Sequence, residues 1–224
     1  MSRFHNLHLG ETVVLLANGY SLNEMNLDFL KEHIVIGMNK IYLGFKKFNF
    51  YPKYYVAIND LVIRQSVEQI RSLSCVKFIS RRNKSLLLEN ALTYHIDTDN
   101  PRVSFFKDIS YGVNEGFTVT YACLQIAYFM GFKRVIIIGM DHSFSYMGNP
   151  NEVKFLEGDD KNHFSPEYFG NQLWQNPDLK KAEKFYRIAD EIFTSNGREI
   201  IDATFKGNCH IFQKRDYREV FFNA

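Results

Sequence analysis

The sequence has few of the residues that would indicate a disulfide scaffold, a zinc knuckle or a polyanion-binding surface. Three of its 224 residues are cysteines, and Cys75, Cys123 and Cys209 lie far apart without a C-x-x-C spacing. This argues against a disulfide framework and a metal site. Lys and Arg number 27 against 25 Asp and Glu, with no long run of one sign. We therefore expect no nucleic-acid partner.

Long apolar segments are also missing. No window reaches the roughly 18 apolar residues of a membrane-spanning helix, and the opening MSRFHNLHLGETVVLLA has no basic segment followed by a sufficient apolar run. We therefore expect a soluble, cytoplasmic protein. At 46% hydrophobic residues the chain can bury a core without disulfides. Its length favours a single nucleotide-binding domain, residues 1–224.

Short β-branched runs alternate with amphipathic helical patterns, which predicts an α/β fold with a Rossmann-like, doubly wound, mostly parallel sheet. The expected strands are 13–17, 33–38, 54–58, 76–80 and 134–139, with weaker candidates at 92–96 and 199–201. Four helix starts are expected: a capping box from Ser21 to Glu24, a cap at Asp60, a buried helix from Thr118, and a long helix capped by Asn176 before Pro177.

Residues 142–175 do not follow this alternation. They have little apolar periodicity and several Gly and Pro residues, yet they are rich in aromatic side chains. Long loops in compact domains are usually functional or disordered, and this composition is too aromatic for a linker. We interpret the segment as a lid inserted after a central strand.

Four predicted strands end in polar residues, namely Asn18, Asn39, Asn59 and Asp141. In an open parallel sheet, ligands bind beyond the carboxyl ends of the strands. Amides offer a donor and an acceptor without charge, which suits base edges and ribose hydroxyls. Gly19 allows close approach of a phosphate, and Ser21 adds a hydroxyl at a helix start. The alternative is that the asparagines form turns and Ser21 only caps its helix.

The loop after the first strand matches neither G-x-G-x-x-G nor a Walker loop, so the sequence does not support a dinucleotide dehydrogenase or a P-loop kinase. Asp141 is a candidate for a ribose hydroxyl or for Mg²⁺, but a Mg²⁺ site needs more oxygen ligands than one carboxylate supplies. We therefore predict no metal site.

The motifs LANGYSLN, GMNK, AIND, GFTVTYACLQIAYFMGFKRVIIIGMD and NHFSPEYFG, followed by a long helix and GREIIDATFKG, occur in this order along the chain. Together they resemble the superfamily of motility-accessory-factor glycosyltransferases and archaeal 6-hydroxymethylpterin diphosphokinase-like proteins. They are also similar to the small bacterial sialyltransferases, whose first loop reads Gly-Asn-Gly-Pro-Ser-Leu. The resemblance spans about residues 13–220.

The sialyltransferase resemblance implies a CMP-activated donor and a role for each matching residue. It implies donor contacts by Asn18, Ser21, Asn39 and Asn59, phosphate contacts by Thr118 and Thr120, a phosphate-assisting Tyr146, and a general base in the lid at His163. Ala17 and Tyr20 depart from the first-loop pattern, and Ser165 replaces the second histidine of a His-Phe-His-Pro motif. The base is therefore open among His163, His142 and Glu167.

Two classes of enzyme follow from these patterns. The first is a glycosyltransferase that moves a sugar, plausibly a nonulosonic acid, from a CMP-linked donor to a glycan, lipid-linked or protein acceptor without a cofactor. The second is a diphosphokinase, which requires Mg²⁺ with cationic clamps, for which Lys40, Arg81, Arg82 and Lys84 are candidates. A non-catalytic nucleotide-binding protein is the third alternative. The aromatic C-terminal segment either docks on the core or forms an oligomer or membrane-surface contact.

Overall fold

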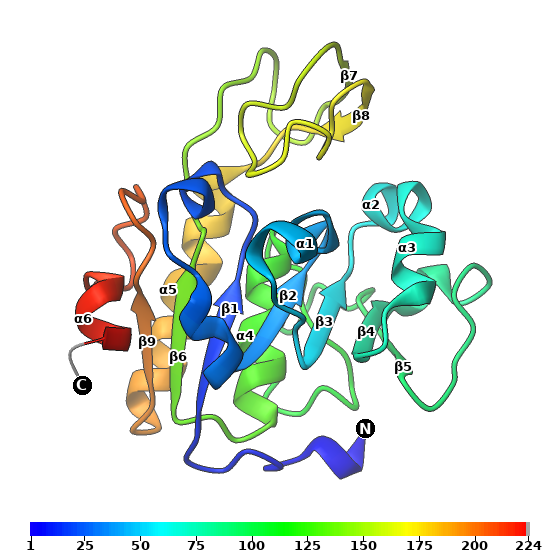
Figure 1. Cartoon of the computed structure of the whole chain (residues 1–224). Helices are drawn as coiled ribbons and strands as arrows, with labels where there is room; N and C mark the ends of the chain where they lie inside the picture. Colours follow the sequence, from blue (N-terminus) through cyan, green and yellow to red (C-terminus); the bar gives the residue numbers. More distant parts are fainter. Residues whose placement is uncertain (223–224) are drawn as a thin grey trace.

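Eight parallel strands form the central sheet of the computed structural model, which describes residues 1–222. Their order is β10-β9-β6-β1-β2-β3-β4-β5 (Figure 1). The strands are β1 (Thr12–Leu16), β2 (Ile34–Met38), β3 (Tyr54–Ala57), β4 (Val76–Ser80), β5 (Thr93–Ile96), β6 (Arg134–Ile138), β9 (Glu199–Asp202) and β10 (Gln213–Lys214). The predicted Rossmann-like α/β class is confirmed.

The direction of strand addition reverses at β1, which lies between β2 and β6. From β1 the chain adds β2 to β5 on one side and returns to add β6, β9 and β10 on the other. β1 pairs with β2 from Val13–Ile34 to Leu16–Gly37, and with β6 from Thr12–Arg134 to Leu16–Ile138. Such a reversal opens a crevice at the carboxyl ends of the strands.

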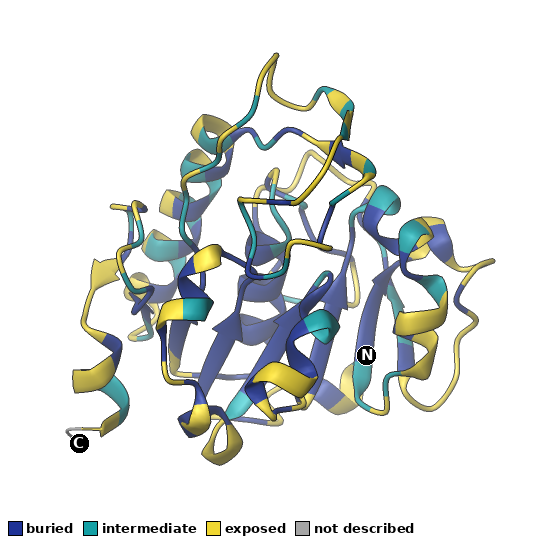
Figure 2. Cartoon of the chain, turned by 45° about the horizontal axis from the view of Figure 1, so that its top comes forward, coloured by how far each residue is buried: buried dark blue, intermediate teal, exposed yellow. Residues whose placement is uncertain are grey.

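The apolar runs of the sequence are strands buried on both faces (Figure 2). On β1, Val13 and Leu15 face one core and Val14 and Leu16 face the other, as the two-residue period of a strand requires. The first core contains α4 (Val119–Phe129) and α5 (Leu179–Ser195); the second contains α1 (Phe45–Phe48), α2 (Asp60–Gln65), α3 (Val67–Ser72) and α6 (Tyr217–Phe222). Short 3₁₀ helices span Ser2–Phe4, Tyr20–Glu24, Asp28–Glu32, Ile41–Gly44 and Arg81–Asn83.

Two helices begin with caps other than those predicted. Asn59, not Asp60, caps α2, because its side-chain oxygen accepts hydrogen bonds from two backbone amides of the first turn at 2.9 and 3.1 Å. Asp178 caps α5, whereas Asn176 donates its side-chain amide to two lid carbonyls at 3.0 and 3.1 Å. Thr118 caps α4 as expected.

The predicted capping box at Ser21 is wrong. The Tyr20–Glu24 segment is a 3₁₀ helix without a side-chain cap. The Ser21 hydroxyl donates instead to a carboxylate 120 residues further along the chain, that of Asp141. A tertiary contact has therefore replaced the local one.

The predicted lid, residues 142–175, lies above the carboxyl ends of the strands (Figure 1). It contains the antiparallel pair β7 (Val153–Leu156) and β8 (Gln172–Gln175). The segment is anchored on the sheet: the Phe164 amide donates to the Asn18 carbonyl at 3.1 Å. Its buried aromatic side chains extend the second core and are Phe164, Tyr168, Phe169 and Trp174.

The C-terminal segment docks on the second core. Tyr217 is buried there, and the ring of Phe221 stacks on Phe29 with centroids 3.9 Å apart. Phe222 is the exposed member of this group, at 51% of its surface. Within residues 1–222, no helix has the length and hydrophobicity needed to cross a membrane.

Candidate functional site

A pocket with two adjoining lobes lies at the reversal of strand order, between the sheet and the lid. The first lobe has a cavity volume of about 140 Å³ and the second about 430 Å³. Segments after β1, β2 and β6, the start of α4, the lid and the start of α5 line the first lobe. The residues common to both lobes are Asn39, Phe117, Thr118, Val119, Phe144, His163, Pro177 and Asp178.

Asn18 and Asn39, which follow β1 and β2, both line the first lobe. Asn18 donates its side-chain amide to the Met38 carbonyl at 3.2 Å, and its buried side-chain oxygen has no hydrogen-bond partner among the described residues. Asn39 has a φ of 50°, a left-handed conformation that asparagine tolerates better than most residues. The structure therefore offers uncharged polar groups at one end of the pocket.

The predicted phosphate nest at the first loop is already filled. The Asp141 carboxylate accepts hydrogen bonds from the Ser21 hydroxyl and, at 3.0 Å, from the Ser21 amide. Gly19 makes room for this carboxylate, because a Cβ at position 19 would lie 2.7 Å from Asp141 Oδ2. Ser21 is not among the pocket-lining residues, whereas Gly19 and Asp141 are.

The start of α4 supplies the anion-binding geometry that the first loop lacks. Thr118, Val119 and Thr120 line the first lobe, and a helix N-terminus with free backbone N–H groups favours negative charge. The Tyr186 hydroxyl donates to Thr118 Oγ1 at 3.3 Å. Phe117, just before the helix, has a φ of 62° and is 46% exposed between the two lobes.

The lid brings His163 into both lobes and pairs it with a second residue, Asp160, that our sequence analysis missed. His163 Nδ1 lies 2.7 Å from Asp160 Oδ2, and the Asp160 side chain is fully buried. The imidazole stacks on Tyr168 with centroids 3.9 Å apart. Burial raises the pKa of Asp160, but hydrogen bonds from His163 and the amides of Asn162 and Phe169 outweigh it, so the pKa is lowered.

This arrangement has the geometry that a general base and an orienting carboxylate require. With Nδ1 bonded to Asp160, the lone pair of the neutral ring is on Nε2. The spacing G-D-D-K-N-H contains the signal, an acidic residue three positions before the histidine, but its meaning depends on the loop conformation.

The other candidates for acid or base are placed less favourably. His142 lines the first lobe, but its Nε2 is paired with Glu183 of α5 at 3.1 Å. Glu167 is exposed and lies outside both lobes. Tyr146, predicted to assist the phosphate, donates its hydroxyl to the Pro177 carbonyl at 3.1 Å and lines neither lobe. The tyrosines of the first lobe are Tyr168 and Tyr186.

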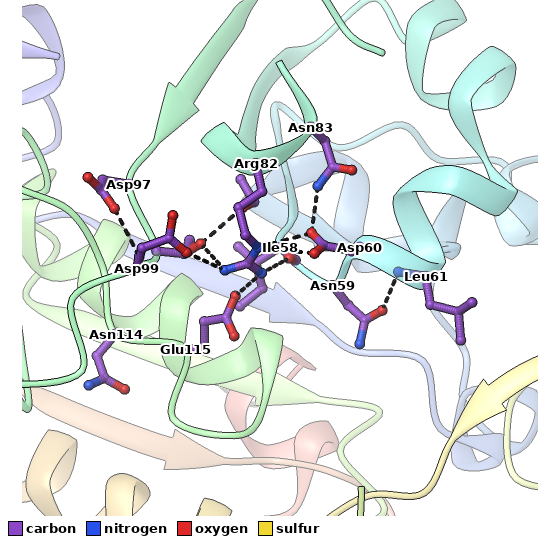
Figure 3. A network of polar contacts seen from close by, with 12 residues as sticks. Ile58, Asn59, Asp60, Leu61, Arg82, Asn83, Asp97, Asp99, Asn114 and Glu115 are labelled. Atoms are coloured by element: carbon purple, nitrogen blue, oxygen red, sulfur yellow. Dashed lines mark hydrogen bonds and ion pairs between the residues drawn. The ribbon is translucent and has the colours of Figure 1, made fainter. Parts of the chain in front are cut away.

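Asn59 lines the second lobe. Near it, Arg82 follows β4 and holds the neighbouring loops together (Figure 3). The Arg82 guanidinium contacts Asp60 at 3.1 Å, Asp99 at 3.0 Å and Glu115 at 2.5 Å. Burial disfavours its charge, but these carboxylates outweigh that effect and raise the pKa of Arg82. Arg82 is therefore already neutralised and poorly suited to clamp a phosphate.

Lys40, a candidate phosphate clamp, is buried below the lid. Its Nζ donates to the Tyr168 carbonyl at 2.6 Å and to the side-chain oxygens of Gln65 and Gln172, each at 2.9 Å. Burial lowers the pKa of Lys40 to about 8, and the nearby Asp160 offsets part of this shift. Lys40 ties the lid to β2 and α2 and lines neither lobe.

The fold and the pocket define a Rossmann-like protein with a cavity at the reversal of strand order. Residues 1–147 match the sequence model of the 6-hydroxymethylpterin diphosphokinase MptE-like family, so the chain belongs to this family. A solved structure with this fold is the MAf glycosyltransferase from Magnetospirillum magneticum AMB-1. The predicted superfamily is thus confirmed.

The structural likeness covers much of this chain and a smaller part of its neighbour. The TM-score is 0.60 at 12% sequence identity, over 96% of this chain and 35% of the Magnetospirillum chain. This chain therefore spans about a third of that glycosyltransferase. Comparison with curated proteins found no match.

Proposed function

We propose that the protein is a glycosyltransferase that moves a sugar from a CMP-linked donor to an acceptor hydroxyl. The observation that carries the proposal is the His163–Asp160 pair, which faces the start of α4 across the pocket. In the part of the chain that the structure describes, no Lys or Arg side chain lines this pocket. The solved neighbour is named a glycosyltransferase, which supports the reaction class without identifying donor or acceptor.

The first lobe takes the nucleotide end of the donor. The amides of Asn18 and Asn39 match the donors and acceptors of a base and a ribose. Thr118 and Thr120 place the donor phosphate at the start of α4, where the helix dipole favours its charge.

Each group then has one step in the reaction. His163 Nε2 accepts the proton of the acceptor hydroxyl, and the hydroxyl oxygen forms the new bond to the anomeric carbon as the bond to the phosphate oxygen breaks. The electron pair of that bond leaves with CMP, whose charge is stabilised by the helix start. Asp160 stabilises the imidazolium. The sequence of steps needs no metal.

A diphosphokinase acting on a hydroxymethyl-pterin is the second candidate, because the family bears that name. Such a reaction concentrates more negative charge, which is usually offset by Mg²⁺ and by cationic side chains. Arg82 is committed to three carboxylates and Lys40 to neutral acceptors. The lining side chains thus favour the glycosyltransferase.

Thermal melting with CMP, CDP, UDP, GDP and ATP, each with and without Mg²⁺, separates the candidates. A nucleotide at 100 times its dissociation constant stabilises by about 2.7 kcal/mol, which raises the midpoint by roughly 5–11 °C for a chain of this size. We expect a metal-independent shift with CMP or CDP. A shift confined to ATP with Mg²⁺ would favour the diphosphokinase.

A non-catalytic nucleotide-binding protein is tested in the same preparation. If CMP binds but no activated sugar is turned over, and His163→Ala changes no measurable activity, the protein binds nucleotide without catalysis.

A further inference from the structure

The second lobe differs from the first in the chemistry of its walls. Amide side chains line it from three parts of the chain, and they are Asn39, Asn59, Asn151, Gln175 and Asn176. Aromatic rings fill the gaps between them, and they are Phe117, Phe144, Phe169 and Trp174. Among residues 1–222, no Lys or Arg side chain lines this lobe.

The amides of this lobe form a chain of long hydrogen bonds between the sheet and the lid. Asn59 donates to Gln175 Oε1 at 3.2 Å, and Gln175 donates to the Asn151 carbonyl at 3.2 Å. Asn151 in turn donates to Asp178 Oδ2 at 3.2 Å. Contacts of this length sit at the long end of the usual range, so a ligand hydroxyl can replace them at little cost.

Two buried polar atoms of residues that line the lobe, Asn39 Oδ1 and Asn176 Oδ1, have no hydrogen-bond partner within residues 1–222. Asn176 is 1% exposed, its side-chain nitrogen donates to two carbonyls, and its side-chain oxygen has no hydrogen-bond partner. A buried acceptor left unpaired costs free energy.

The two carboxylates of the lobe are already paired. Glu115 contacts Arg82 at 2.5 Å, and Asp178 contacts Lys181 at 3.2 Å. The lobe is therefore close to electrically neutral, rich in amide donors and acceptors, and walled by rings. These are the groups that bind hydroxyls and the C–H faces of a pyranose.

We infer that the second lobe is the acceptor subsite and that it takes a neutral sugar. The inference rests on the proposed function and deepens it, because His163 lines both lobes and so reaches an acceptor hydroxyl in one lobe and the donor in the other. An acidic acceptor is disfavoured, since its carboxylate would meet no cation in the lobe and two existing carboxylates.

Saturation-transfer NMR on the full chain, with saturating CMP present, tests this assignment. The probes are galactose, glucose, N-acetylglucosamine and N-acetylgalactosamine, with galacturonic and glucuronic acids as charged counterparts. We expect at least one neutral sugar to bind, and its uronic acid counterpart to bind at least tenfold more weakly. Gln175→Ala should weaken the neutral sugar at least threefold. Gln69→Ala, another exposed glutamine, should leave it unchanged.

CMP binding, followed by thermal shift on the same proteins, separates the two hypotheses. If CMP binds and no neutral sugar does, the subsite assignment fails and the proposed function stands. If Gln175→Ala behaves as Gln69→Ala, or if the uronic acids bind as well as the neutral sugars, the assignment fails as well. If neither CMP nor any sugar binds, both fail.

Discussion

At the residue scale, the site depends on a pairing that the sequence contains but does not reveal. His163 was a candidate from its place in the lid, whereas Asp160 became a candidate only through the loop, which brings the two side chains to 2.7 Å from each other. The position of Asn18 and Asn39 at the pocket was predictable, because Asn39 directly follows β2 and Asn18 lies two residues after the end of β1. Ser21 was not, since its hydroxyl prefers a carboxylate 120 residues away.

The role of the His163–Asp160 pair can be measured by substitution. His163→Ala should lower the rate of sugar transfer by about 10²- to 10⁴-fold, the usual contribution of a general base, with CMP affinity unchanged. Asp160→Asn should lower the rate in the same direction, because an amide stabilises the imidazolium less well than a carboxylate.

The exposed His210 provides a matched control. His210→Ala should retain full transfer and CMP affinity. A His163→Ala protein that loses CMP binding together with activity would assign His163 to binding and not to proton transfer.

At the element scale, the strands were predictable and the helix caps were not. A parallel strand covered on both faces must be apolar along its length, so a short run such as Val13–Leu16 has few alternatives. Adjacent residues such as Asn59 and Asp60 have similar preferences for the N-cap position of a helix, and tertiary contacts decide which of them caps it. The lid's aromatic residues proved to be core packing as well as pocket walls.

The contact between the first loop and the β6 end gives a test at this scale. Gly19→Ala places a Cβ within 2.7 Å of Asp141 Oδ2, so the carboxylate must leave Ser21. We expect a loss of about 1–3 kcal/mol in the free energy of unfolding, the usual cost of overpacking, measured by urea denaturation.

A double-mutant cycle checks the cause. In an Asp141→Ala background, Gly19→Ala should cost less than half as much, because the colliding group is gone. Equal costs in the two backgrounds would mean that the loss arises from the backbone of the loop and not from Asp141.

At the scale of the whole molecule, the lid and the sheet are held together by a buried lysine. Lys40 Nζ donates to the carbonyl of the lid residue Tyr168, 128 residues away. It also donates to the side chains of Gln65 in α2 and Gln172 in the lid. From the sequence, Lys40 was a candidate phosphate clamp for the diphosphokinase. The sequence does not reveal its burial, because the docked lid covers Lys40 and no local pattern encodes that long-range contact.

The lowered pKa of Lys40 gives the stability a defined pH dependence. The folded pKa is about 8, against an ordinary value of 10.5. Between these values the unfolded chain binds more protons than the folded one, so this residue makes stability rise with pH in that window. Relative to Lys40→Met, the free energy of unfolding of the wild type should rise by at most about 1.4 kcal/mol per pH unit.

Urea denaturation from pH 7 to 10.5 measures this difference. Lys53→Met, at an exposed position, should parallel the wild type across the range. A constant difference between the wild type and Lys40→Met at all pH values would mean that Lys40 has the same pKa in the folded and unfolded chains.

The single tryptophan of the chain lies in the lid, and this has a spectroscopic consequence. Trp174 is 4% exposed, and its ring centroid is 6.4 Å from that of His163. Because Trp174 lines the second lobe, a ligand bound there should change its emission, so the unlabelled protein carries its own optical indicator of binding.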